Sequence, residues 1–432
     1  MSKVMKKILF YIDVKFVSPV SVSNGNIEKT DGDVLRDFDG NPFISGASLA
    51  GAMRGYLKKD KTDQCIFGYA GNKSDEFGKM SSLYLSDLTF KKPEKIRVVV
   101  RDGVGLSEGK TALTNAKYDM EAIDTGAEGS FIMELIVREN DLENEENMLS
   151  QIYQVLYGIE QGEIRLGNKK TRGYGEMTLK AVRRKEYTAN NILEYVNAYN
   201  AEADYGNPEE CKEICLQKAN KEEMHYLHIE VPLKLTGGIC IRQYSSKKGE
   251  PDMVHITAND KPVIPGTSFT GAIRSRMKEI LRMLFNDTYT TEQIDQVIKE
   301  LWGYVDKENA RRSYITIGES ILEGAVSVRS VRTGVSRFES AAKSGALREE
   351  RIYTGGTTAL KINVSKEAEW AMGLLILVVK EIQNGYLPVG GQTAVGRGVF
   401  EGNGSITIDK MEIDENEYLQ NFQNHIEGGM KA

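Results

Sequence analysis

Asn41–Asp60 reads NPFISGASLAGAMRGYLKKD, and Lys261–Ile280, 220 residues further on, reads KPVIPGTSFTGAIRSRMKEI. Eight of the twenty paired positions carry identical residues. Two further landmarks recur in the same order: Phe67-Gly68-Tyr69 with Trp302-Gly303-Tyr304, and the glycine-rich segment Gly162–Met177 with Gly385–Phe400. This ordered repetition indicates tandem duplication of one module.

Each half opens on a run typical of a β-strand, Lys7–Phe16 and His225–Leu235, and a helix starts in the Gly-Ser segment that follows. The sequence further predicts a helix at Glu145–Gly158 and strands at Ser82–Phe90, Ile96–Arg101, Gly129–Val137, Met177–Val182, Ser313–Glu319, Ala325–Val331, Thr357–Val364 and Ala371–Val379. The β-α-β…α-β order predicts an α+β fold, an antiparallel sheet backed by helices in each half. Nucleic-acid-binding modules often have this ferredoxin-like arrangement.

The net charge of −6 by itself argues against a nucleic-acid partner, but the charge is unevenly distributed. Residues 1–185 hold 28 Lys and Arg against 27 Asp and Glu, and residues 225–400 hold 23 against 19. The excess of acid lies in residues 186–224, with 3 against 9, and in residues 401–432, with 2 against 7. We therefore expect domains at 1–185 and 225–405, a solvated acidic helical connector at 186–224 and an acidic tail at 406–432, with local phosphate-binding stripes on the two domains.

The chain lacks the signatures of a membrane, secreted or nucleotide-hydrolysing protein. Its longest apolar stretch, Met372–Val379, is too short to span a bilayer, and Asp13 interrupts the N-terminal run without a signal-cleavage site, so we expect a cytoplasmic protein. Four cysteines do not make a disulfide framework, and the closest two, Cys211 and Cys215, are expected to be thiols on one helix face. No P-loop is present, because Asn168 follows Gly167 where the motif needs lysine, and we expect no nucleotide cofactor.

The repeated pattern G-x-S-x-x-G-A-x-R is suited to phosphate binding. Its glycine and serine leave backbone N–H groups open at a helix start, and its arginine could pair with a phosphate. The residues concerned are Gly46, Ser48 and Arg54 in the first half and Gly266, Ser268 and Arg274 in the second. The alternative is tight packing of the helix on the sheet, which also selects small residues.

The two glycine-rich segments could likewise direct backbone amides at a phosphate. Basic side chains accompany them, and the candidate residues are Lys169, Lys170, Arg172, Gly173, Gly390, Gly391 and Arg397. The alternative is a turn that requires positive φ.

Histidine chemistry cannot be common to both halves, because none of the four histidines lies in the first. Carboxylates remain as candidates. The loop between the first strand and first helix carries Asp31, Asp33, Asp37 and Asp39, and its counterpart carries Asp252 and Asp260. A loop aspartate is ordinarily a turn residue or an N-cap, so catalysis is one of two open interpretations.

The Gly-Ser helix start with its trailing arginine, an RDGV…TG segment and a terminal glycine-rich loop together resemble the RAMP superfamily of CRISPR-associated proteins. The resemblance covers about Lys7–Arg184 and about His225–Gly404, and it is strongest to backbone subunits of type III effector complexes, here a fused III-D-like form. It implies two tandem ferredoxin-like (RRM-like) domains, each with an inserted thumb β-hairpin and a C-terminal glycine-rich loop. Arg101 and Arg332 open the two thumb segments.

The family's loop motif matches Asp31, Val34-Leu35 and Arg36-Asp37, so the resemblance implies that Asp31 is catalytic. Asp252 takes the equivalent place in the second half, although Ile256-Thr257 replaces the basic-acidic pair. The implied activity is guide-directed cleavage of target RNA that depends on Mg²⁺ or Mn²⁺, with guide RNA, target RNA and other complex subunits as partners and no membrane. The motif does not identify metal ligands.

Two other functions remain open from the sequence. The chain could be a purely structural guide-RNA-binding backbone, in which both aspartates are turn residues. It could also be a stand-alone guide-RNA-processing endoribonuclease, which the scarcity of histidine disfavours.

Overall fold

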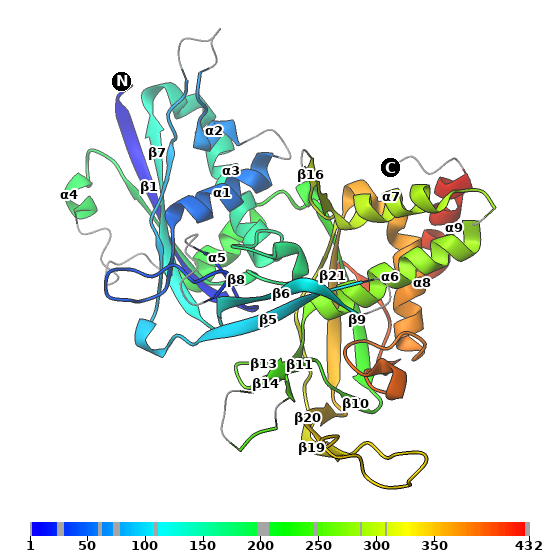
Figure 1. Ribbon diagram of the computed structural model, residues 1–432. Helices are drawn as coiled ribbons and strands as arrows, with labels where there is room; N and C mark the ends of the chain where they lie inside the picture. Colours follow the sequence, from blue (N-terminus) through cyan, green and yellow to red (C-terminus); the bar gives the residue numbers. More distant parts are fainter. Residues whose placement is uncertain are drawn as a thin grey trace. The chain divides into compact units, whose positions relative to one another are not determined.

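A computed structural model of the chain describes residues 2–23, 30–58, 63–71, 78–107, 111–196, 207–245, 249–251, 253–285, 287–306 and 309–427. The chain forms two compact units (Figure 1). The first comprises Met1–Arg101, Tyr118–Lys170 and Tyr174–Met224, and the second comprises Asp102–Lys117, Thr171–Gly173 and His225–Ala432.

The first unit is built on a sheet in the order β2-β4-β7-β1-β8, with β3 also paired to β7. Its strands are β1 (Val4–Phe16), β2 (Phe43–Ile44), β3 (Leu83–Leu85), β4 (Leu88–Phe90), β7 (Glu128–Arg138) and β8 (Met177–Tyr187), and its helices are α1 (Gly46–Leu57), α2 (Gln64–Phe67), α3 (Glu145–Glu160), α4 (Ile192–Tyr195) and α5 (Pro208–Gln217). β1 pairs antiparallel with both β7 and β8. This is the predicted ferredoxin-like arrangement.

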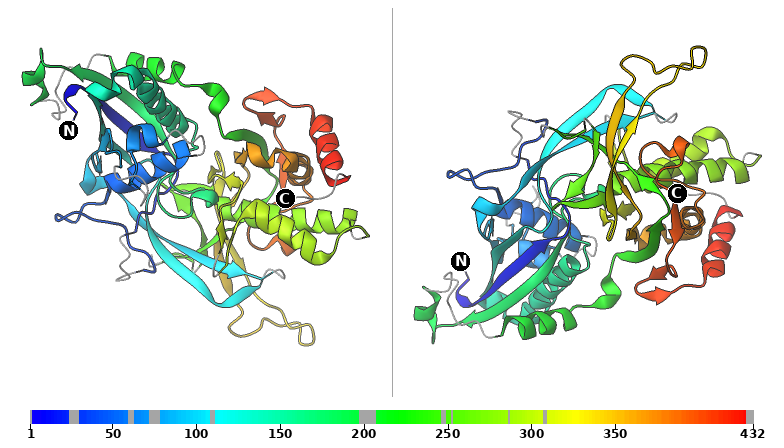
Figure 2. Two further views of the ribbon diagram at one scale, coloured as in Figure 1. Left: turned by 90° about the horizontal axis from the view of Figure 1, so that it is seen from above. Right: turned by 90° about the horizontal axis from the view of Figure 1, so that it is seen from below.

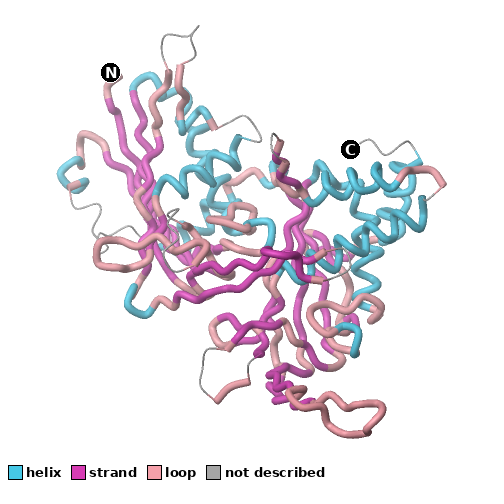
Figure 3. The backbone as a smooth tube through the Cα atoms, in the orientation of Figure 1, coloured by secondary structure: helices cyan, strands magenta, loops and turns pink. Residues whose placement is uncertain are grey.

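Alternation along β1 explains how the helices cover the sheet. Ile8, Phe10 and Ile12 are fully buried in the same core cluster as Met53 of α1 and Ile152 of α3, as expected for strand residues that share one face. Figure 3 shows α1, α2 and α3 on one side of these strands and the short α4 on the other.

The connector differs from the solvated helix that its composition predicts. α5 contacts β8 and α3, and Cys215 is 2% exposed within the core of the first unit. The acidic residues of α5 lie on its other faces, so the segment is amphipathic and belongs to the unit.

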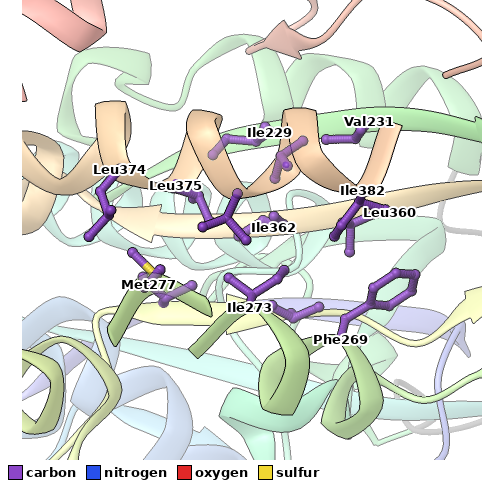
Figure 4. Packing of buried hydrophobic residues seen from close by; sticks show 14 of the residues in the cluster. Ile229, Val231, Phe269, Ile273, Met277, Leu360, Ile362, Leu374, Leu375 and Ile382 are labelled. Carbon is purple, nitrogen blue, oxygen red and sulfur yellow. The ribbon is translucent and has the colours of Figure 1, made fainter. Parts of the chain in front are cut away.

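The second unit repeats the arrangement in the order β17-β21-β9-β23-β24, with β22 also paired to β9. Its sheet strands are β9 (Tyr226–Leu235), β17 (Ile315–Ile317), β21 (Thr357–Ser365), β22 (Phe400–Gly402), β23 (Thr407–Ile408) and β24 (Met411–Glu412), and its helices are α6 (Gly266–Phe285), α7 (Thr291–Trp302), α8 (Met372–Gln383) and α9 (Glu415–Glu427). Side chains of α6 and α8 pack on β9 and β21, with Met277 and Leu375 among them (Figure 4).

The prediction of a strand at Ala371–Val379 was wrong, because this segment forms helix α8. Its apolar run is buried on nearly all sides, against the sheet, α6 and α9, so it lacks the one-sided periodicity that separates helix from strand. β22 and β23 take the sheet position expected for it. α9 lies beside α8 (Figure 2), and Phe422 of α9 is 4% exposed, so the described part of the acidic tail packs on the unit.

Each repeat carries the predicted thumb hairpin. β5 (Val98–Leu106) pairs with β6 (Ala112–Ile123), and β19 (Val326–Arg332) pairs with β20 (Arg348–Thr354). The β19–β20 hairpin projects from the body of the second unit (Figures 1 and 2). The remaining short strands are β10 (Gly238–Ile239), β11 (Arg242–Tyr244), β12 (Met253–His255), β13 (Thr257–Ala258), β14 (Lys261–Ile264), β15 (Tyr304–Val305), β16 (Ala310–Arg311) and β18 (Ser320–Ile321). Over the part of the chain described above, no helix combines the length and apolar character needed to cross a membrane.

Candidate functional site

The loop that holds Asp31 in the first unit is fixed by a short-range turn. Asp33 is buried, and its Oδ1 accepts hydrogen bonds from the backbone N–H of Thr30 at 3.0 Å and from its hydroxyl at 2.9 Å. Asp33 is therefore a turn residue, as loop aspartates ordinarily are. Two residues before it, Asp31 is exposed.

Glu121 on β6 ties the same loop to the thumb. Its backbone N–H donates to Gly32 O at 3.0 Å, and its Oε2 accepts from the backbone N–H of Val34 at 3.1 Å. One guanidinium nitrogen of Arg36 donates to both carboxylate oxygens, at 3.1 and 3.0 Å. Because the Glu121 carboxylate is buried, these charge-assisted bonds hold the loop firmly against the strand.

Asp31 and Asp119 face each other across this junction. The backbone N–H of Asp31 donates to Asp119 Oδ1 at 3.2 Å, and the backbone N–H of Asp119 donates to Asp31 Oδ2 at 3.0 Å. The second oxygen of each carboxylate has no hydrogen bond from any residue in the described ranges. The exposed Asp31 and the half-buried Asp119 thus each present a fixed carboxylate oxygen that could accept a proton or bind a hard cation.

These donors fit Mg²⁺ or Mn²⁺, which favour carboxylate oxygens and retain several waters. Within the described residues no cluster of three or more His, Cys, Asp or Glu side chains could enclose a metal. A divalent ion at Asp31 and Asp119 would therefore need further oxygen ligands from water or from a bound phosphate.

The first glycine-rich loop lies against the same end of β6. A Cβ at Gly167 would lie 2.2 Å from Ser21 O, and its φ of 77° also excludes most side chains, so the turn needs glycine. Lys169 follows with its Nζ 3.7 Å from the centroid of the Tyr118 ring. Tyr118 directly precedes Asp119 in β6, so the loop places a cation beside the strand that carries Asp119, against a side chain of its other face. Lys170 and Arg172 bound the next short turn, and Gly173 has a φ of 93°.

The helix starts favour the packing alternative. The backbone N–H of Gly46 donates to Asp87 Oδ1 at 2.7 Å, and that of Ser48 is capped by the side chain of Ser45. These donors are occupied by the protein's own oxygens. A Cβ at Gly46 would lie 2.8 Å from Leu85 O, which explains the glycine by close packing.

The second repeat has the same close approach at its helix start. A Cβ at Gly266 would lie 2.2 Å from Ile317 O, and the N–H of Ser268 donates to Pro265 O at 2.9 Å. In the terminal loop, Gly390 has a φ of 100° and the N–H of Gly391 donates to Cys240 O. Each of these glycines therefore has a structural explanation.

Three of the arginines predicted to bind RNA have partners within the protein. Arg54 donates to Asp63 Oδ2 at 2.9 Å and to Gly68 O at 3.0 Å. Arg101 is 3% exposed beside Asp124, and Arg397 is 3% exposed and donates to Glu350 at 2.9 Å. By contrast, three exposed arginines have side chains that make no hydrogen bond or ion pair with residues that the structure describes: Arg172, Arg274 and Arg332.

Asp252 lies outside the described residues. Close to it in sequence, His255 on β12 is 2% exposed, accepts from the Ile241 N–H at Nδ1 (3.0 Å) and has Nε2 3.0 Å from Val263 O. Burial lowers the pKa of His255 to about 4, so its ring is neutral near pH 7. His255 is therefore a structural residue that fixes the strand next to the second loop.

Sequence reasoning missed Asp119 and Glu121. Their spacing of two residues on a strand places both on one face, and that alternation within the thumb was the available signal. That alternation gave no indication of which residues they contact, because the partners of Asp119 and Glu121 lie at residues 31–36, far away in the sequence.

Two ferredoxin-like modules, each with a thumb hairpin and a glycine-rich loop, define a class of duplicated nucleic-acid-binding proteins. The sequence profile of the RAMP superfamily matches residues 13–178 and 227–401, one match per repeat. The chain therefore belongs to the RAMP superfamily, whose members are CRISPR-associated RNA-binding modules. A comparison with curated proteins gives no match.

Proposed function

We propose that the chain is the fused, two-module backbone subunit of a type III CRISPR effector complex, of the III-D kind, and that it binds guide RNA and cleaves complementary target RNA. Asp31 is the catalytic residue of the first module and Asp252 that of the second. Other subunits of the complex and the two RNAs are its partners. Sequence specificity comes from guide pairing, and the protein reads the shape and phosphates of the backbone.

The observation that carries this proposal is the fixed, exposed carboxylate of Asp31. A solvated turn aspartate would be free to rotate, whereas Asp31 is oriented by Asp119 on the thumb. The loop that bears it is held by a buried carboxylate, Glu121. Hydrogen bonds of this kind give a reacting group the repeatable geometry that catalysis requires.

The residues of the first module support one mechanism. The free oxygen of Asp31 accepts a hydrogen bond from the 2′-hydroxyl of a target nucleotide that has been displaced from its stack, and it orients that hydroxyl for in-line attack on the adjacent phosphate. Lys169, whose Nζ lies over the ring of Tyr118, supplies positive charge to an RNA backbone that passes along this strand. Mg²⁺ or Mn²⁺, held by the carboxylates of Asp31 and Asp119, would supply further neutralisation of phosphate charge when bound.

The test is a complex reconstituted with guide RNA and end-labelled target RNA, in which Asp31→Ala and Asp252→Ala are made separately. We expect each variant to lose a different cut while guide binding is unchanged, and chelation by EDTA to abolish all cuts. Asp39→Ala is the matched control, since Asp39 is an exposed carboxylate of the same loop. If the Asp31→Ala complex still makes every cut, Asp31 is not catalytic, and the chain acts as a guide-RNA-binding structural subunit.

One observation favours the alternative function, a guide-RNA-binding subunit that does not cleave RNA. Asp31 Oδ2 already accepts a hydrogen bond from within the protein, as a purely architectural aspartate would. The isolated chain distinguishes the third alternative: cleavage of RNA without guide or partner subunits would identify a stand-alone endoribonuclease.

A further inference from the structure

The two thumb hairpins can be compared residue by residue. The second strand of each runs to a Thr-Gly pair, Thr125-Gly126 in the first repeat and Thr354-Gly355 in the second. Six residues after each threonine, Phe131 and Leu360 are buried, and they lie opposite residues of β1 and β9 in the two sheets. One constant spacing therefore relates β6 to β20.

This spacing shows one shared residue and one exchange of charge. Glu121 and Glu350 each stand four residues before the threonine, and both are buried and bind an arginine from outside the hairpin. Two positions earlier the thumbs differ: the first carries Asp119, which orients Asp31, and the second carries Arg348. The carboxylate of the first thumb is thus replaced by a guanidinium in the second.

Arg348 lies directly opposite another arginine. In the register of β19 and β20 its partner is Arg332, so the two side chains share one face, with Cβ atoms about 5 Å apart. Both residues are exposed, and neither side chain makes a hydrogen bond or ion pair with a residue in the described ranges. Like charges directly opposite each other destabilise a hairpin, so folding does not explain this pair.

The carboxylate on the same face is already neutralised. Glu350, two residues along β20 from Arg348, accepts a hydrogen bond from the Arg397 guanidinium at 2.9 Å. The Arg242 guanidinium lies 3.1 Å from its other oxygen. This face therefore has more arginines than carboxylates.

The opposite face of the hairpin has balanced charges. Arg329 and Arg351 are also directly opposite each other, but each has a carboxylate of its own. Arg329 pairs with Glu349, and Arg351 pairs with Glu250 at 2.8 Å. Arg329 is exposed like Arg332 and lies on the same strand, so it offers a control with a neutralised charge.

The composition of the two thumbs differs in the same sense. Residues 326–354 hold 6 Lys and Arg against 3 Asp and Glu, whereas residues 98–123 hold 3 against 4. The basic hairpin, β19–β20, projects from the body of the second unit (Figure 1). Its excess charge is therefore presented on an accessible arm.

We propose that Arg332 and Arg348 form a clamp for one phosphodiester of bound RNA, so that the second thumb holds the RNA backbone where the first thumb orients Asp31. This inference rests on the proposed function. Two guanidinium groups on adjacent strands can donate hydrogen bonds to the same phosphate, whose negative charge removes their mutual repulsion. The phosphate belongs to the guide or to the target strand, which offer the same chemistry.

RNA binding by the full-length chain tests the clamp. Affinity is measured at several salt concentrations, with EDTA present, for guide RNA alone and for the guide–target duplex. We expect Arg332→Gln and Arg348→Gln each to weaken binding about threefold to tenfold and to reduce the salt dependence by about one charge. Loss with guide RNA alone assigns the phosphate to the guide, and loss confined to the duplex assigns it to the target.

Arg329→Gln is the matched control, because it removes the same charge from the other face, where Glu349 neutralises it. We expect its RNA affinity to stay within about twofold of the unmodified chain. Equal losses in all three variants would show that only the total charge of the hairpin matters, and this would overturn the clamp. Unchanged affinity in Arg332→Gln and Arg348→Gln would overturn it as well.

Thermal unfolding without RNA supplies an independent readout. Arg348→Gln should leave the Tm unchanged or raise it, because it relieves the repulsion from Arg332. A clear fall in Tm would show that Arg348 has a structural role, which contradicts the proposal. None of these measurements requires cleavage, so failure of the clamp is distinguishable from failure of the proposed function, which the cuts lost in Asp31→Ala and Asp252→Ala test.

Discussion

Asp31 and Asp119 exchange two backbone-to-carboxylate hydrogen bonds, at 3.2 and 3.0 Å, although 88 residues separate them in the chain. Each residue uses one carboxylate oxygen to accept the other's N–H, and the second oxygen accepts no hydrogen bond from the described residues; Asp31 is exposed and Asp119 is half-buried. The thumb strand β6 therefore orients the Asp31 loop directly. Under the proposed function, the thumb is part of the cleavage site as well as a candidate RNA contact.

Asp119→Ala should slow cleavage at the first-module site by roughly tenfold to a hundredfold, since the Asp31 N–H loses a partner and the loop loosens. Guide-RNA affinity should stay unchanged. Asp119→Asn keeps an oxygen acceptor, so recovery of cleavage in that variant identifies a positioning role. Equal loss in both variants would show that the negative charge itself is needed, as for a cation ligand.

The candidate site was only partly predictable from sequence. Asp31 could be named because the loop motif lies within seven consecutive residues. Asp119 could not, because its role depends on the register between a distant hairpin and that loop. The same holds for the arginines. The duplication identified Arg54 as a repeated residue, but its ion pair with Asp63 depends on the way the chain turns after α1, which the sequence did not show.

Arg54→Ala should destabilise the first unit by about 1–3 kcal/mol, because it leaves the buried Asp63 carboxylate without its ion pair. Guide-RNA affinity of the folded protein should not change. Arg332→Ala is the matched contrast: its side chain is exposed, so stability should stay within about 0.5 kcal/mol. RNA affinity should fall, and the slope of affinity against salt should decrease by about one charge. If both variants lose RNA affinity and neither loses folding stability, Arg54 contacts RNA after all.

Gly46→Ala should cost about 2–3 kcal/mol of folding free energy, because its Cβ would lie 2.8 Å from Leu85 O. Gly51→Ala on the same helix meets no atom within 4 Å and should stabilise the unit by up to about 1 kcal/mol. Urea unfolding of the full chain measures both. If Gly51→Ala also weakens guide binding, the small-residue face of α1 does lie against the RNA backbone.

The fold itself was more predictable than the site. Strands β1 and β9 combine alternation with β-branched residues, so their bounds follow closely from periodicity. Helix α8 was misassigned because Leu374, Leu375 and their neighbours are buried by elements on several sides. A helix that is buried on several sides has no polar face, so its sequence lacks the alternation of polar and apolar residues that distinguishes a helix from a strand.

Stability should fall as the pH drops from about 6.5 to 4, because His255 stays neutral in the folded chain. Its pKa of about 4 lies below the ordinary 6.5, so in this interval the unfolded chain binds a proton that the folded chain does not. The loss amounts to about 3 kcal/mol when complete. Thermal unfolding at several pH values measures it, and His255→Gln, which keeps an amide donor and acceptor, should flatten this part of the profile. An unchanged slope in that variant would assign the pH dependence to other groups.

Phe422→Ala should destabilise the second unit by about 3–4 kcal/mol, because this side chain is 4% exposed and packs in the core that α8 and the sheet share. Phe338, on the β19–β20 hairpin, is fully exposed and supplies a control with the same chemical change. Phe338→Ala should leave stability within about 0.5 kcal/mol. Urea unfolding distinguishes the two variants. Equal, small effects would mean that α9 is dispensable and that the acidic tail contributes only charge.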